Sequence, residues 1–268
     1  MDFKSASRLF FALTLIAIGI IGLAGGEIAP IWQPVPETTP GRQMLVYLSA
    51  FVSLACGAGL LAKPTFVPAS LTLTIFLIVW TACFKFPFIF RAPLEEVSYQ
   101  TNGENAVLIA AAWTLYAEAA AGRKFVAGEF GLQLASLLYG LALIAFGLSH
   151  FFYLQMTAPL VPSWLPGPVF WAYLTGAIYL ATGVGLVTGL ASRPAALAAA
   201  VQITLITLLV WGPMLFAGPL SEVHWQETVV SWALTAGAWV IASAQRPMRA
   251  MHRGRLLPNP SIASDSPR

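Results

Sequence analysis

The chain has 268 residues, of which 58% are hydrophobic and only 9% are charged. A soluble domain carries about 25% charged residues, so this composition excludes a soluble globular protein and indicates an integral membrane protein. The formal net charge is +3 at pH 7. In a membrane protein, such an excess belongs near anionic headgroups and does not indicate nucleic-acid binding.

Apolar runs follow one another along almost the whole chain, and several approach or exceed the ~20 residues that a helix needs to cross a bilayer. They fall at about 8–25, 43–62, 66–88, 105–121, 132–155, 168–190, 194–216 and 228–245. We therefore expect an all-α, polytopic membrane protein with eight transmembrane helices. The first run could be read as a signal peptide. It shares Leu, Ala and Gly positions with the fifth run at a spacing of 125 residues, so we expect a retained span.

The first half of the chain is repeated in the second half at a spacing of 126 residues. Without any gap, Val35–Glu118 and Val161–Ala244 are identical at 26 of 84 positions, where chance gives roughly a tenth. This predicts two four-helix repeats at residues 1–125 and 126–245, followed by a basic and disordered tail at 246–268. Because each repeat holds an even number of spans, both repeats have the same orientation.

Basic residues lie mostly at one end of the predicted helices. That end carries eleven of them: Lys4, Arg8, Lys63, Arg123, Lys124, Arg193, Arg246, Arg249, Arg253, Arg255 and Arg268. The opposite end carries Arg42 and Arg91, and Lys85 lies within its span. This bias predicts that both termini are cytoplasmic, in a bacterial inner membrane.

One segment of the second half resembles a known family. The stretch Val161-Pro-Ser-Trp-Leu-Pro-Gly-Pro-Val-Phe-Trp-Ala-Tyr-Leu-Thr-Gly176, continuing to Gly183-Val-Gly185, is similar to the DoxX-like bacterial membrane proteins, and Asn102-Gly103-Glu104 resembles a segment before their fourth span. The resemblance implies a tandem fusion of two four-span units. Some members of the family are linked to sulfur-compound oxidation with quinone as acceptor, and others to oxidative-stress complexes.

Lys85 is the costliest residue to place in a membrane, because a charge at mid-bilayer costs roughly 2.5–3.5 kcal/mol on insertion scales. One interpretation is a lysine that extends toward the outer headgroups. The other is a cation that faces a cavity and pairs with Glu95, Glu96 or Glu104. Its repeat counterpart is Trp211, so the charge belongs to one half only.

Further polar side chains are expected at the same outer end. Glu96 and Glu222 are kept in both halves and could favour the N-termini of the following helices, or could handle protons or a ligand. The candidate polar cluster is Lys85, Glu95, Glu96, Glu104, His150, Glu222, His224 and Glu227. No metal-ligand spacing is present, so no metal site is predicted.

Outer aromatic residues form either an ordinary interfacial belt or contacts to a ligand. The candidate contacts are Phe86, Trp164, Trp171, Trp211 and Trp225, and Trp32 belongs to the same aromatic set. The chain has no catalytic motif. We therefore expect an accessory or ligand-binding subunit that contacts lipids and a partner protein. The alternatives are the membrane subunit of a quinone-linked oxidoreductase and a small transporter.

Overall fold

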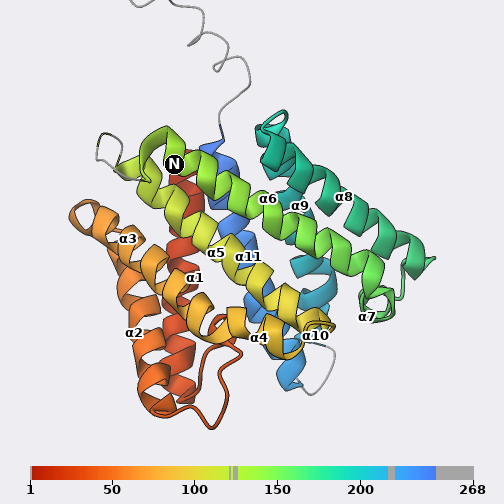
Figure 1. The fold of residues 1–268 in the computed structure, drawn as a ribbon, viewed down its shortest axis with the longest axis horizontal. Coiled ribbons are helices and arrows are strands. Elements are labelled where there is room, and N and C mark those ends of the chain that lie inside the picture. The colour runs from red at the N-terminus through yellow and green to blue at the C-terminus, as the bar shows by residue number, and fades with distance from the viewer. Residues whose placement is uncertain (1, 121, 123–125, 217–220, 246–268) are drawn as a thin grey trace, which may run out of the picture.

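The computed structural model describes residues 2–120, 122, 126–216 and 221–245, and every regular element in this part of the chain is helical (Figure 1). The predicted all-α class is therefore confirmed. The tail at 246–268, for which we predicted disorder, lies outside the described residues.

Five helical segments are long and apolar enough to cross a membrane. They are α1 (Phe3–Gly25), α3 continued through α4 (Lys63–Arg91), α6 (Gly128–Phe152), α8 (Pro168–Thr188) and α9 continued through α10 (Ser192–Met214). A multi-pass membrane protein is thus supported by helix length and composition. The expectation of eight spans stays a prediction at the other three positions.

Those three positions are also helical, as α2 (Arg42–Gly59), α5 (Glu96–Ala119) and α11 (Glu222–Ala244). More than half of the residues of α5 and of α11 are buried, and both helices run through the middle of the bundle (Figure 1). Helices that other helices cover need not be as apolar as helices that face lipid. This explains why α5 and α11 can contain glutamates.

The helices pack in matching pairs in the two halves of the chain. α1 packs along α2, and α6 packs along α8; α3 packs on α5, and α9 packs on α11. Across the halves, α1 contacts α11, α6 contacts α5, and α5 contacts α11. The first long helix of each half thus lies against the last long helix of the other half.

Glycines allow the closest of these helix pairs to approach backbone to backbone. A Cβ atom on Gly57 would lie 2.8 Å from the carbonyl oxygen of Ala12, and one on Gly183 would lie 2.7 Å from that of Gly140. Small residues at such crossings drive helix association in lipid. Gly57 and Gly183 are 126 residues apart, and their partners Ala12 and Gly140 are 128 apart, which differs from the spacing of 125 at which the first and fifth apolar runs share residues. The close packing at this crossing follows the positions of small residues, not the spacing at which the first and fifth apolar runs share residues.

One π-helical turn interrupts the third long helix in each half of the chain. The two turns are η2 (Thr81–Lys85), followed by α4 (Phe86–Arg91), and η4 (Thr207–Trp211), followed by α10 (Gly212–Met214). Pro87 and Pro213 lie just beyond them, where proline removes a donor from the helical hydrogen-bond ladder. In the first half, Asn102 Nδ2 donates a hydrogen bond of 2.9 Å to the carbonyl oxygen of Lys85 at the bend.

The connection between α1 and α2 folds back into the bundle. It contains the short helix η1 (Pro30–Trp32), and the Trp32 side chain is completely buried. The indole N–H of Trp32 donates to Ser53 Oγ at 3.0 Å. The main-chain carbonyl oxygen of Trp32 accepts a hydrogen bond from the indole N–H of Trp80 at 2.8 Å. Of the two interpretations of the outer aromatic residues, the interfacial belt does not hold for Trp32, because a bilayer-facing ring could not make these internal contacts.

The remaining connections are short. Three residues, 60–62, link α2 to α3, and three, 189–191, link α8 to α9, so each of these two helix pairs forms a tight hairpin. The connection from α6 to α8 contains α7 (Leu154–Thr157) and η3 (Ala158–Leu160), whose residues are at most half-buried. The second half therefore has no counterpart of the buried Trp32 among these described residues.

Candidate functional site

Lys85 is completely buried at the end of the π turn η2. Its Nζ atom donates to the main-chain carbonyl oxygen of Ile31 at 3.0 Å and lies 3.5 Å from that of Thr101. These bonds join the inserted loop, the bent third helix and α5 at one point. A fully buried ammonium does not reach the headgroups, so the structure does not support the interpretation that Lys85 extends to the membrane surface.

Glu104 is the charged residue with which Lys85 interacts electrostatically. Its side chain is 6% exposed and accepts a hydrogen bond of 3.2 Å from Gln100 Nε2. Lys85 and Glu104 interact electrostatically, but no direct ion pair joins them. The space around these two side chains therefore holds a charge of each sign inside the helical bundle.

Two further glutamates lie within electrostatic range of Glu104. Glu96 is the first residue of α5, and Glu227 lies on α11; both are half-buried. Glu227 interacts with Glu104 and with Glu96. We call Lys85, Glu96, Glu104 and Glu227 the buried charge cluster. It draws on both halves of the chain and holds three carboxyl groups for one ammonium.

A buried acceptor without a partner lies next to this cluster. Asn105 is fully buried, and its Nδ2 atom donates to Thr81 Oγ1 at 2.8 Å. Its Oδ1 atom has no hydrogen-bond partner among the described residues. Such an atom costs about 1–3 kcal/mol of folding free energy when nothing binds it. The Asn105 carbonyl is therefore able to accept a hydrogen bond from a bound group.

The other predicted polar residues lie outside this cluster. Glu95, Glu222 and His224 are exposed, and Glu222 accepts a hydrogen bond from Gln226. As predicted for helix N-termini, Glu96 and Glu222 each occupy the first turn of their helices. His150 is half-buried at the end of α6, where its Nδ1 atom lies 2.8 Å from the Phe146 carbonyl oxygen.

The predicted aromatic contacts do not form one group. Phe86, Trp164 and Trp225 are exposed, Trp171 is half-buried, and Trp211 is buried. Trp211 ends the π turn η4, as Lys85 ends η2. Within the described residues, no group of three or more His, Cys, Asp or Glu side chains is arranged to hold a metal ion.

Sequence reasoning missed several groups that surround Lys85. The carbonyl oxygens of Ile31 and Thr101 carry no signal in the side-chain pattern, because main-chain acceptors are present at every residue. Asn102 was noted only as part of a family-like segment. Gly103, which follows it, packs directly on Phe146, since a Cβ atom there would lie 2.7 Å from the phenyl ring.

Comparison with known families matches the DoxX family over residues 131–212. The chain carries a DoxX domain. No curated protein and no solved structure matches the chain. The resemblance noted at Val161–Gly176 lies inside the matched residues and is confirmed there. The resemblance of the first half, including Asn102–Glu104, lies outside them and stays a prediction.

The DoxX domain runs from α6 to the end of the π turn η4 and contains its own buried polar group. Tyr139 is completely buried and its hydroxyl has no partner among the described residues; the same holds for Gln202 Oε1. Tyr179 interacts with both of them and contacts the His150 ring at a centroid distance of 5.6 Å. The buried charge cluster lies outside the matched residues, so the family match gives it no role.

Proposed function

We propose that this chain is a ligand-binding or accessory subunit of a membrane complex and that the buried charge cluster is its binding site. One comparison within the chain carries the proposal. At a spacing of 126 residues, Trp211 corresponds to Lys85 and Val230 corresponds to Glu104, and both are buried. In the second half, uncharged side chains thus fill the corresponding buried positions, so the fold does not require charges there.

Keeping these charges is unfavourable unless they serve a purpose. Replacing a buried ion pair by well-packed apolar residues is often neutral or stabilising, whereas intramembrane ionisable residues are typically functional. The cluster holds Glu96, Glu104 and Glu227 against Lys85 alone. Its charges balance when protons or a cationic group of a ligand occupy it, so we expect a ligand that donates hydrogen bonds or carries positive charge.

The proposed architecture is a duplicated eight-helix unit with both termini on the cytoplasmic side of a bacterial inner membrane. The duplication is supported by the 26 identities in 84 positions and by the two π turns, which begin at Thr81 and Thr207. The orientation is supported by the basic residues near the ends of α1, α3 and α9. The buried charge cluster then lies toward the outer side of the membrane.

A membrane subunit of a quinone-linked oxidoreductase is the second candidate. The observation that favours it is the surface beside the cluster: Phe86 follows Lys85 directly, is 51% exposed and packs edge-on against Phe90. A lipid-soluble aromatic headgroup could stack there and accept a hydrogen bond or a proton from the cluster. In that case the electrons come from a partner protein, because the quinone supplies the redox chemistry.

Native mass spectrometry of the protein extracted in its own lipids tests the proposal. The bound molecules are identified after organic extraction from the wild type, from Glu104→Gln and from the control Glu222→Gln, whose carboxylate lies on the surface. We expect a stoichiometric ligand that Glu104→Gln loses and Glu222→Gln keeps. A quinone would select the second candidate. Equal retention by all three proteins would refute the buried charge cluster as the site.

A further inference from the structure

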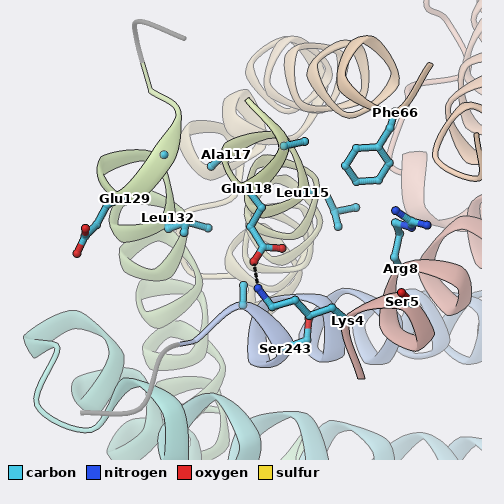
Figure 2. A pocket seen from close by; sticks show the side chains of 13 residues that line it. Lys4, Ser5, Arg8, Phe66, Leu115, Ala117, Glu118, Glu129, Leu132 and Ser243 are labelled. Atoms are coloured by element: carbon cyan, nitrogen blue, oxygen red, sulfur yellow. Dashed lines mark hydrogen bonds and ion pairs between the residues drawn. The ribbon is translucent and has the colours of Figure 1, made fainter. Parts of the chain in front are cut away.

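We propose that a second site, at the opposite end of the bundle from the buried charge cluster, binds the phosphate group of an anionic membrane lipid. This goes beyond the proposed function and does not depend on it. The site is a cavity of about 640 Å³ at the end that carries the N-terminus. We call it the terminal cavity; Figure 2 shows the side chains that line it.

The terminal cavity lies where the two halves of the chain meet. It is lined by the start of α1, the end of α5, the start of α6, the end of α11 and Phe66 of α3. Lys4 and Arg8 lie in the first turns of α1, and Gly128 begins α6. Because α1 and α6 are both candidate spans, their first turns are at the depth of the lipid headgroups.

Arg8 is the group in the cavity that can attract an anion. Lys4 pairs with Glu118. The Arg8 guanidinium lies over the Phe66 ring, 5.0 Å from its centroid, and forms no ion pair within the described part of the chain. Glu129 also lines the cavity, but Figure 2 shows its side chain pointing away from Lys4 and Arg8. The exposed Asp2 carboxylate also interacts with Arg8, but it accepts a hydrogen bond of 2.8 Å from the Ser5 main-chain N–H at the start of α1. The Arg8 guanidinium is available to bind phosphate by two parallel hydrogen bonds.

The other walls suit the remainder of a lipid. Phe66, Leu115 and Leu132 supply apolar surface, against which the start of an acyl chain can pack. Ser243 also lines the cavity. The N-cap residue of α6, Ala127, makes no side-chain hydrogen bond to the helix, and a helix N-terminus without such a cap adds to the attraction for an anion.

Lipid titration of the purified full-length protein tests this proposal. Phosphatidylglycerol is added to the protein in a neutral detergent, with phosphatidylcholine and free glycerol phosphate as separate arms, and bound molecules are counted by native mass spectrometry. We expect phosphatidylglycerol to bind more tightly than either other probe. Tight binding of free glycerol phosphate without a preference for the lipid would overturn the assignment to a membrane lipid.

Three variants locate the binding. Arg8→Gln should weaken phosphatidylglycerol binding about tenfold, the loss of one charge-assisted contact. Glu118→Gln should strengthen binding, because it frees Lys4 and removes the competing carboxylate. Arg193→Gln is the matched control, since Arg193 is exposed at the start of α9 and does not line the cavity. Thermal unfolding in detergent without added lipid checks that each variant is folded.

The pattern across the variants decides the matter. Binding that is weaker in Arg8→Gln, stronger in Glu118→Gln and unchanged in Arg193→Gln supports the terminal cavity. Equal losses in Arg8→Gln and Arg193→Gln would show general attraction to a basic surface and would overturn the proposal. The same holds if Arg8→Gln binds like the wild type. None of these outcomes depends on the ligand of the buried charge cluster.

Discussion

Thr81 and Thr207 are 126 residues apart, and each begins a π-helical turn in the third long helix of its half. Each also bonds to the last long helix of that half: Thr81 Oγ1 accepts from Asn105 Nδ2 at 2.8 Å, and Thr207 Oγ1 lies 2.7 Å from Ser231 Oγ. Asn105 and Ser231 are again 126 residues apart. The same hydroxyl thus secures the same bend in both halves.

Loss of the Thr207 hydroxyl should destabilise the bundle. Thr207 is buried, and its Oγ1 atom also lies 2.8 Å from Thr235 Oγ1, so Thr207→Val leaves buried partners unsatisfied, at about 1–3 kcal/mol. We expect a lower midpoint of thermal unfolding in detergent. Thr188→Val is the control, because Thr188 is exposed and bonds to the Val184 carbonyl oxygen of its own helix. Equal midpoints for the two variants would show that the bend does not rely on this hydroxyl.

Trp32→Ala should be among the most disruptive substitutions in the chain. It empties the space of a completely buried indole that packs edge-on against Phe76 and Trp80, which typically costs about 3–5 kcal/mol. Trp164→Ala removes an indole that is 64% exposed and should have little effect. Denaturant titration monitored by circular dichroism measures both. A Trp32 variant as stable as the Trp164 variant would contradict the insertion of this loop.

Tyr139→Phe should leave the DoxX domain equally stable or make it more stable. The substitution removes a buried hydroxyl that has no partner among the described residues and keeps the ring, so it removes a cost of about 1–3 kcal/mol. Tyr173→Phe, at a 40% exposed side chain, is the control. A clearly lower unfolding midpoint for Tyr139→Phe alone would mean that the hydroxyl binds a group that stabilises the protein.

Composition and hydropathy were sufficient for the all-α class, because membrane helices must be apolar where they face lipid. The prolines at 87 and 213 also mark in the sequence where the third long helix of each half departs from the regular α-helix, since proline cannot continue a helical hydrogen-bond ladder. The buried position of Trp32 could not be predicted, because a proline-rich connection between two helices normally runs over the surface. The path of that loop depends on acceptors and donors such as Ser53 and Trp80, which are distant in the chain.

The candidate site was predictable only in part. Lys85 and the glutamates were recognisable because charges are rare in such a chain. The candidate polar cluster contained all four members of the buried charge cluster, but the sequence did not separate them from Glu95, His150, Glu222 and His224. Glu227 joins Glu96 and Glu104 through the packing of α11 on α5. Glu222 lies on the same helix as Glu227 but stays on the surface. Sequence separation alone does not distinguish these two acids, since the face that each presents depends on how α11 is rotated in the bundle.

The central claim is that the buried charges serve binding and not folding. The most direct test compares the free energy of unfolding of the wild type with Lys85→Met, Glu104→Val and the double variant, in which position 104 carries the residue type found at Val230. Each single change leaves one buried charge without its electrostatic partner, which should lower the free energy of unfolding. The account predicts that the double variant regains most of this loss. A double variant destabilised by the sum of both single changes would contradict it.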